Sequence, residues 1–285
     1  MANRNCDIAI VYRIHPKVSK TPLVFADDKY RLAETCLRSL KAGLNGLEVK
    51  IWALLDNCPP RYQKLFESLF SPEELVCESL PGVGNTGTFA RQIEILCTQT
   101  DSELVYFAED DYFYLPDRLV ELVGLMRENQ EIDFVSPYDH LDYYTLAFHQ
   151  HPVKVRATAQ RHWRQANSTC MTFMTRRHVL QKTRPLFMSY INGNYDVSIW
   201  MALTKMRAFD FTFFLHCGLT DRLLRTAYAK AWWYGWRQLL CGRRYQLWTP
   251  IPSIATHMES TAIAPIIDWK TEISKLQRQI KKDRN

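Results

Sequence analysis

The sequence predicts an α/β fold with a mostly parallel central sheet flanked by helices, and two patterns support this. Strand-like apolar runs alternate with helix-like patterns over residues 7–136, as expected of repeated βαβ units. The run 104–108, Leu-Val-Tyr-Phe-Ala, is apolar throughout, as in a strand covered on both faces. It leads into Glu109-Asp110-Asp111. Because ligands of open α/β sheets bind at the carboxyl ends of the strands, we expect the functional site there.

The elements of the first half follow from periodicity, caps and turn residues. Strands are expected at 7–14, 48–55, 74–80, 104–108 and 132–136, and helices at 27–42, 61–70, 89–98 and 116–128. For the first helix, Asp27 or Asp28 can cap the N-terminus and Gly43 can end the last turn.

The second half is less regular. A polar stretch at 140–164 precedes a strand-like run at 168–175, a helix that opens at Arg177, a helix at 196–205 and a last helix at 268–282. We expect one α/β half at 1–136, a second half of the same domain at 137–262, and a basic amphipathic C-terminal helix within 263–285.

Composition narrows the class of protein. A chain of 285 residues with 47% hydrophobic and 23% charged residues is globular and not broadly disordered. The cysteines are scattered without a Cys-x-x-Cys pair, so we expect reduced thiols in the core and not a zinc site or a disulfide framework. No signal-peptide pattern opens the sequence and no apolar run approaches the roughly 20 residues that span a bilayer, which favours a cytoplasmic protein. Of the net charge of +6, residues 270–285 supply +4 through six Lys/Arg and two Asp/Glu, so the nearly neutral body argues against nucleic-acid binding.

The three consecutive carboxylates Glu109, Asp110 and Asp111 repel one another. A divalent cation with oxygen ligands is the usual way to offset such repulsion, so we expect a metal and a phosphate at this strand end. The alternative is a solvated acidic turn before the helix that Pro116-Asp117 begins.

Two further polar groups follow the second and third strands. Asp56-Asn57 can accept hydrogen bonds from a ribose or a base, although these two residues taken alone favour an Asx turn before Pro59. The loop Gly84-Asn85-Thr86-Gly87-Thr88 precedes a helix, where free N–H groups favour an anion; a flexible connection is the alternative. Arg91, one turn further, can reach a phosphate or lie on the surface.

Two candidates come from the second half. Asp196 stands in the first turn of a helix, where the dipole favours an ionised carboxylate such as a general base requires; a plain N-cap is the alternative. His257 lies in the proline-rich segment 250–260, which can fold back over a metal site, although a lone histidine is more often structural.

The span 221–245 interleaves Trp232, Trp233 and Trp236 with six Lys/Arg residues. Such a span suits an interfacial membrane helix, a stacking wall for an acceptor sugar, or core packing with basic residues at the surface. The last helix places Trp269, Ile273, Leu276 and Ile280 on one stripe, which predicts packing against the body with the basic face toward solvent or anionic lipid. Peripheral membrane contact through 221–245 and 268–285 is therefore one expectation for this chain.

Together these features resemble the GT-A glycosyltransferases, most closely the inverting family-2 type. The matching stretches, in chain order, are Ile8-Ala9-Ile10-Val11-Tyr12, Asp56-Asn57, Gly84-Asn85-Thr86-Gly87 with Arg91, Glu109-Asp110-Asp111, Ser168–Phe173 with Arg176-Arg177, and Asn194–Trp200. Two departures stand out, because Glu109 replaces the first acid of the family's Asp-x-Asp and Tyr195 replaces the acid that usually precedes the base. Residues 140–165 and the Trp-rich span have no counterpart in the family pattern.

The resemblance implies a GT-A, Rossmann-like nucleotide-sugar-binding half at 1–136 and a mixed acceptor-side half at 137–262. It implies transfer of a sugar from a nucleotide-diphosphate donor to the hydroxyl of a glycan or lipid-linked acceptor, with inversion, in glycan or polysaccharide synthesis. Asp196 would be the catalytic base, and Asp111, Glu109 and His257 would hold Mn²⁺ or Mg²⁺. The donor would contact Tyr12, Asp56, Asn57, Gly84, Asn85, Arg91, Glu109 and Asp110.

Three alternatives remain at this stage. A retaining GT-A glycosyltransferase would give Asp196 another role. A sugar-nucleotide pyrophosphorylase would need a glycine-rich basic loop after the first strand, where this chain has Tyr12-Arg13-Ile14-His15-Pro16-Lys17. A non-catalytic protein could use the span 221–245 to hold a membrane or a polyanion, and it would not need the acidic triplet.

Overall fold

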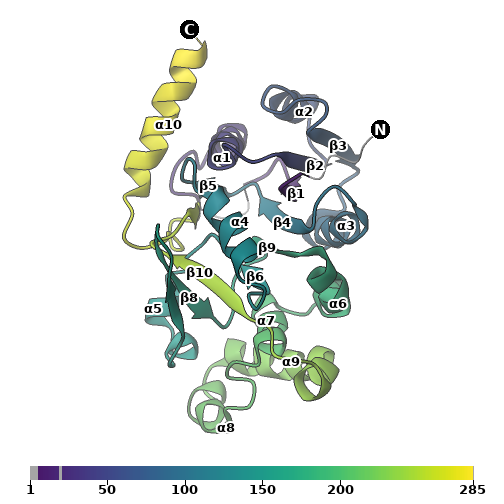
Figure 1. The fold of residues 1–285 in the computed structure, drawn as a ribbon, viewed down its shortest axis with the longest axis vertical. Coiled ribbons are helices and arrows are strands. Elements are labelled where there is room, and N and C mark those ends of the chain that lie inside the picture. The colour runs from purple at the N-terminus through teal and green to yellow at the C-terminus, as the bar shows by residue number, and fades with distance from the viewer. Residues whose placement is uncertain (1–5, 19–20, 285) are drawn as a thin grey trace.

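The computed structural model describes residues 6–18 and 21–284. Its main sheet has nine strands in the order β3-β2-β1-β4-β9-β6-β10-β8-β7 (Figure 1). Seven of these strands run in one direction, and only β8 and β9 oppose them. This confirms the predicted α/β fold with a mostly parallel sheet and a mixed second half.

The strands of the main sheet are β1 (Ile8–Ile14), β2 (Val49–Asp56), β3 (Leu75–Leu80), β4 (Leu104–Glu109), β6 (Phe134–Val135), β7 (Val155–Ala157), β8 (His162–Ala166), β9 (Phe173–Arg176) and β10 (Leu247–Ile251). A second small sheet pairs β5 (Tyr112–Tyr114) antiparallel with β11 (Ala255–His257). The helices are α1 (Lys29–Gly43), α2 (Pro60–Glu67), α3 (Gly84–Thr98), α4 (Leu119–Glu128), α5 (Asp142–Thr145), α6 (Arg177–Met188), α7 (Asp196–Thr204), α8 (Phe211–Phe213), α9 (Arg222–Cys241) and α10 (Trp269–Arg284). Short η segments lie at Ala147–His149 (η1), Ser189–Asn192 (η2) and Phe214–Gly218 (η3).

The sheet is buried on both faces, which explains the unbroken apolar runs of its central strands. Along β4, Leu104, Tyr106 and Ala108 join one core cluster, while Val105 and Phe107 join the other. The first cluster lies under α1, α2, α4 and α10, and the second under α3, α6, α7 and α9. Because side chains alternate along a strand, a strand covered on both faces has to be apolar at every position.

Three of the differences from the predicted boundaries bear on the site. Helix α4 begins at Leu119 and not at Pro116, because Asp117 has φ 59° and so cannot be helical. Residues 112–114 form β5, whose partner β11 is far away in sequence. Strand β9 begins only at Phe173. The predicted glycine loop is instead the first turn of α3, with Gly84 in the left-handed region at φ 73°. All eight cysteines are free, as expected, but only Cys36 and Cys97 are fully buried.

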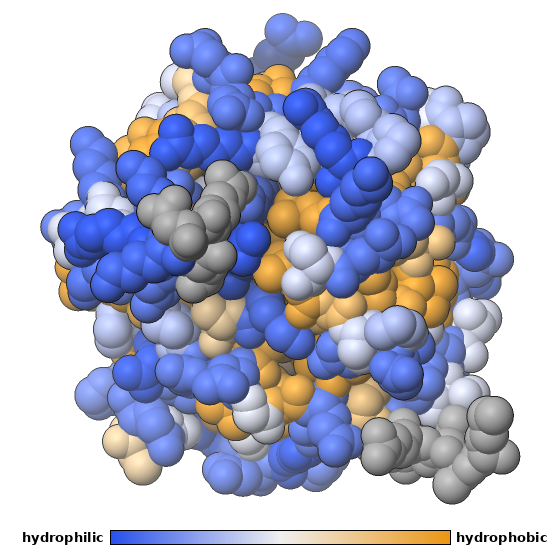
Figure 2. Space-filling view, turned by 90° about the horizontal axis from the view of Figure 1, so that it is seen from above, coloured by the Kyte–Doolittle hydropathy of each residue, from blue (hydrophilic) through white to orange (hydrophobic). Residues whose placement is uncertain are grey.

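The two ends of the molecule differ. Helices α8 and α9 form the lower end in Figure 1, and α10 reaches the upper end. Seen from above, hydrophilic side chains ring that upper end, and hydrophobic ones gather toward its middle (Figure 2). Within residues 6–18 and 21–284, each helix is too short or too polar to cross a membrane.

Candidate active site

The strand order positions the site. The chain runs outward from β1 through β2 to β3 and then returns to β4 on the other side of β1. A crevice forms at such a switch point, beyond the carboxyl ends of the strands. Here it is a cavity of 540 Å³ lined by 18 residues. It gathers eight of the predicted site residues: Asp56, Gly84, Asn85, Glu109, Asp110, Asp111, Asp196 and His257.

The three carboxylates of the acidic triplet point to different partners. Glu109 pairs with Arg13, its parallel neighbour across β1 and β4, and its Oε2 accepts a hydrogen bond from the Thr172 hydroxyl at 2.7 Å. Asp110 Oδ2 lies 2.8 Å from Lys29 Nζ and accepts the amide of His15 at 3.1 Å. Two of the three charges are therefore paired with side-chain cations, and the binding of a metal at this strand end stays a prediction.

Asp111 is the exception. Its Oδ2 lies 3.2 Å from His257 Nε2, whereas its Oδ1 is buried and has no hydrogen-bond partner among the described residues. Burial acts to raise the pKa of Asp111, but the attraction of His257 and its hydrogen bond outweigh burial and lower it. For Asp110, burial raises the pKa, with Lys29 opposing and the charge of Asp111 adding to the rise. Asp111 is thus an ionised carboxylate with one oxygen still to be satisfied.

His257 reaches Asp111 because β11 pairs with β5 and sets His257 opposite Tyr112. The amide of Glu259 donates to His257 Nδ1 at 3.1 Å. That bond puts the ring proton on Nε2, so His257 donates to the carboxylate of Asp111. In this arrangement the ring is an N–H donor toward the cavity.

Asp56 has a structural task. Its Oδ1 accepts the amides of Gly82 and Val83 at 2.9 and 2.8 Å, and its Oδ2 accepts the amide of Gly84 at 2.9 Å. The carboxylate at the end of β2 therefore caps α3, which has no side-chain cap of its own. These three amides are consequently engaged before any anion binds.

Asn85 joins the site through Arg13, whose Nη1 donates to the Asn85 carbonyl at 3.0 Å, and through its own amide, which donates to the Tyr190 hydroxyl at 2.9 Å.

Three predicted residues lie outside the cavity. Tyr12 is fully buried in the core and packs edge-on against Phe66, because its position on β1 points away from the cavity. Asn57 is exposed in a left-handed turn with φ 53°. Arg91 is held on the surface by Glu78 at 2.8 Å and Glu94 at 2.7 Å.

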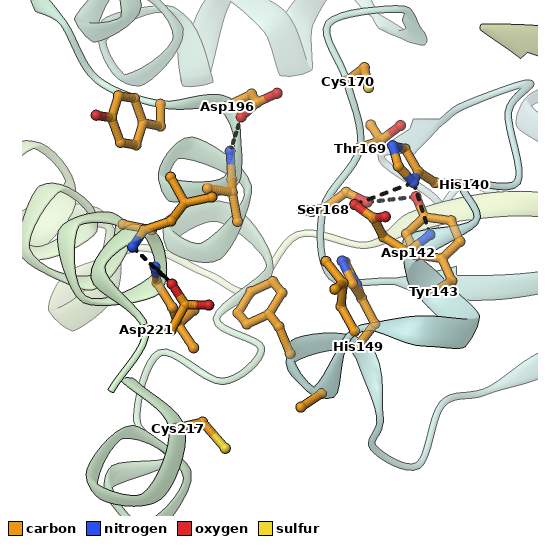
Figure 3. Close-up of a pocket in the computed structure, with 18 of the residues that line it drawn as sticks. His140, Asp142, Tyr143, His149, Ser168, Thr169, Cys170, Asp196, Cys217 and Asp221 are labelled. Atoms are coloured by element: carbon orange, nitrogen blue, oxygen red, sulfur yellow. Dashed lines mark hydrogen bonds and ion pairs between the residues drawn. The ribbon is translucent and has the colours of Figure 1, made fainter. Parts of the chain in front are cut away.

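A second cavity of 450 Å³ adjoins the first and lies within the second half of the domain, at residues 140–227. Among the described residues, only Cys170 and Asp196 line both cavities. Figure 3 shows Asp196 and Cys170 at one end, Cys217 at the opposite end, and His149 and Tyr143 along one side. The cavity is assembled from residues 140–149 and 168–170, the start of α7, and segments α8, η3 and α9, so its residues are too dispersed to form a motif.

Asp196 opens α7, as predicted, and stands where the two cavities meet. Its Oδ1 accepts the amide of Val197 at 2.7 Å, which holds the carboxylate at the helix start. A carboxylate in this position can take a proton from a hydroxyl group in one cavity that attacks a carbon atom in the other.

Sequence comparisons with known proteins find no matching family model and no matching curated protein. Solved structures with a similar fold include galactosyltransferase LgtC in complex with donor and acceptor sugar analogs, at 11% identity and a TM-score of 0.48, covering 94% of each chain. CMP:2-keto-3-deoxy-manno-octonic acid synthetase complexed with CTP matches at 13% identity and 0.41, covering 97% of this chain and 99% of that one. Residues 1–349 of S. aureus TarS in complex with UDP-GlcNAc match at 12% sequence identity and a TM-score of 0.44. The match covers 68% of this chain and 52% of that chain. At such identities and TM-scores the likeness carries no argument, so the chemistry has to be argued from the residues of this site.

Proposed function

We propose that this protein is a glycosyltransferase that moves a sugar from a nucleotide-diphosphate donor in the strand-end cavity to an acceptor hydroxyl in the second cavity, with inversion. The observation that carries the proposal is the position of Asp196 at the junction of a charged cavity and an apolar one. A transferase that joins two substrates needs two adjoining sites and one base between them.

A divalent cation fits the strand-end cavity. The buried Oδ1 of Asp111 lacks a partner among the described residues, and the lining holds five carboxylates against three Lys/Arg side chains. Across residues 6–18 and 21–284, no three His, Cys, Asp or Glu side chains converge to hold a metal by themselves. Mg²⁺ and similar ions commonly bind through one or two carboxylates plus substrate phosphates, which suits a site whose remaining ligands arrive with the donor.

In this proposal Asp111 is the first ligand to Mn²⁺ or Mg²⁺. Glu109 stays with Arg13 and Thr172 and acts as a positioning residue. His257 holds Asp111 through Nε2–H, and it could ligate the cation only by moving its proton to Nδ1 and giving up the Glu259 amide. The bound cation would supply charge neutralisation for the leaving diphosphate.

The reaction would be a single displacement. The acceptor oxygen forms a bond to the anomeric carbon while Asp196 takes its proton, and the bond to the diphosphate breaks with its electron pair leaving on the diphosphate oxygen. Attack from the face opposite the leaving group inverts the configuration, and a retaining enzyme would need a nucleophile or an attack from the same face. The anomer of the product distinguishes the two.

Thermal unfolding with UDP, GDP, CDP and dTDP, each with and without Mn²⁺, tests the donor site. A nucleotide at about a hundred times its dissociation constant should stabilise the fold by roughly 2.7 kcal/mol. We expect a shift for one base that requires Mn²⁺, that Asp111→Asn removes, and that the surface control Glu94→Gln keeps. Absence of a shift with every nucleotide would favour the non-catalytic alternative.

A further inference from the structure

Helix α9 carries two apolar faces on opposite sides. Its buried face, Ala227, Tyr228, Ala231, Gly235 and Leu239, packs on the body of the protein. On the other side, Trp233, Trp236 and Leu240 follow one another at helical spacing and are 78%, 48% and 60% exposed. By contrast, α10 buries Trp269, Ile273 and Ile280 and presents its basic residues outward.

The outward face of α9 is fixed by close packing behind it. A Cβ added to Gly235 would lie 2.7 Å from the Cβ of Ala202 in α7, so only glycine allows the two helices to approach this closely. Rotation of α9 to bury the tryptophans would bring larger side chains to this contact. The exposed stripe is therefore a stable surface of the folded chain.

The segment before α9 also exposes large apolar side chains at this end of the molecule. Phe211, Leu215, Leu219 and Leu223 are 64%, 61%, 48% and 65% exposed. They lie in α8, in η3, in the turn that follows η3 and at the start of α9, respectively. This surface is also basic, because residues 211–245 contain six Lys/Arg and one Asp/Glu. Exposed aromatic and aliphatic side chains among cations are complementary to the interface of an anionic membrane.

The second cavity opens onto this surface. Leu223 and Leu146 line the cavity and are also exposed, so they stand at its mouth. Phe148, Phe213 and Leu224, which join or pack against the second core cluster, make the wall apolar. Asp196, Ser168 and Thr169 bring polar groups to the cavity (Figure 3). The cavity thus leads from an apolar surface to the carboxylate proposed as the base.

From these observations we propose that the acceptor is an amphipathic lipid: its hydrocarbon part enters the second cavity from a membrane on which α8, η3 and α9 rest, and its hydroxyl reaches Asp196. This deepens the proposed function and rests on it for the role of Asp196. The contact is made by the lower end of the molecule alone, because α10 lies toward the opposite end (Figure 1).

Flotation with vesicles tests the surface. We expect the protein to float with vesicles of phosphatidylcholine mixed with phosphatidylglycerol and to bind weakly to phosphatidylcholine alone. The double substitution Trp233→Gln with Leu240→Gln should abolish flotation, whereas Ile266→Gln, which removes an equally exposed apolar side chain near α10, should not. Equal flotation of both variants, or no flotation of the unaltered protein, would overturn the proposal that this surface binds membranes.

Calorimetry with alkyl glucosides below their micelle concentrations tests the cavity. Methyl glucoside and octyl glucoside share a head group, so a difference between their affinities measures the contribution of the alkyl chain. We expect affinity to rise by up to about fourfold per methylene until the chain outgrows the cavity, and Leu224→Gln to flatten this dependence. Equal binding of the methyl and octyl compounds would refute the lipid site.

The nucleotide-dependent thermal shift separates the two proposals. A protein that keeps that shift but fails both lipid tests remains a transferase with a different acceptor. A protein that binds lipid without any nucleotide shift contradicts the proposed function instead.

Discussion

The two cavities that meet at Asp196 are built in different ways. The strand-end cavity is framed by ion pairs and backbone amides, with Arg13 on Glu109, Lys29 on Asp110 and Asp56 on the start of α3. The second cavity is framed by helices and aromatic rings, with polar groups near Asp196. This difference is what the two proposals above require, with a nucleotide diphosphate and its cation in the strand-end cavity and a largely apolar acceptor in the second cavity. Four substitutions or titrations test this contrast.

The largest effect, a loss of kcat, is expected from a substitution of Asp196, where the two cavities meet. Asp196→Asn removes the proposed base without changing the shape of either cavity, so kcat should fall by about 10²–10⁴-fold while the nucleotide-dependent thermal shift is unchanged. The matched control is Asp142→Asn, which alters another acid of the second cavity and should leave kcat within a few-fold. Full activity of Asp196→Asn would show that the base is elsewhere.

The second-largest effect, on the free energy of unfolding, is expected in the strand-end cavity. Arg13→Met leaves the carboxylate of Glu109 without its cation in a site where both side chains are largely buried, which should cost about 3–5 kcal/mol of unfolding free energy. Adding Glu109→Gln to Arg13→Met removes the unpaired charge and should restore most of that loss. Chemical denaturation of the two single variants and the double variant measures the coupling; additive losses would contradict the pairing.

A pH titration probes two buried groups, His149 in the wall of the second cavity and Asp139 outside that wall. Burial lowers the pKa of His149 to about 4 and raises the pKa of nearby Asp139 to about 6. Between pH 4 and 6.5 the unfolded chain protonates His149 more readily, so this group destabilises the fold as pH falls. Asp139 acts in the opposite sense, because its folded carboxyl keeps a proton that the unfolded one has lost, and stability declines as pH rises from 4 to 6.

The opposite effects of His149 and Asp139 on the pH dependence of the unfolding free energy should nearly cancel in the unaltered chain. Asp139→Asn should therefore make unfolding free energy fall on acidification, and His149→Gln should make it rise, each by up to about 3 kcal/mol across this range. Denaturation at several pH values gives both slopes. Identical pH profiles for the two variants would mean that these groups are not buried as described.

The smallest effect concerns the helix behind the second cavity. Gly235→Ala places a methyl group against Ala202 and should lower unfolding free energy by about 1–3 kcal/mol. Gly124→Ala in α4 is the matched control, since its added methyl meets nothing within 4 Å and should stabilise by about 0.5–1 kcal/mol. Melting temperatures of the two variants should therefore move in opposite directions.

Features that depend on residues adjacent in the sequence were predicted correctly. The buried strand that ends at Glu109, the helix that starts at Asp196 and the stripe on α10 are all recognisable from neighbouring residues, and the structure has each of them. Glu109 and Asp196 meet His257 in one cavity, and Glu109 lies there because β4 ends at the carboxyl edge of the main sheet.

The sequence was a poor guide where partners are distant. Arg13 and Lys29 were not singled out from the sequence, because the carboxylates with which they pair lie far along the chain. The glycine-rich stretch looked like an open anion loop because nothing local shows that Asp56, on another strand, caps it. The second cavity comes from several short segments without periodicity, which no pattern of spacing reveals.

The capping of α3 by Asp56 also bears on the thermodynamics of ligand capture. Fixing the backbone of a residue costs about 1–2 kcal/mol in conformational entropy. Residues 82–84 have already lost that freedom in the folded chain, since one carboxylate holds all three of their amides. A donor that settles against this turn meets a surface already in place, so its association should be limited by diffusion and desolvation and not by loop ordering.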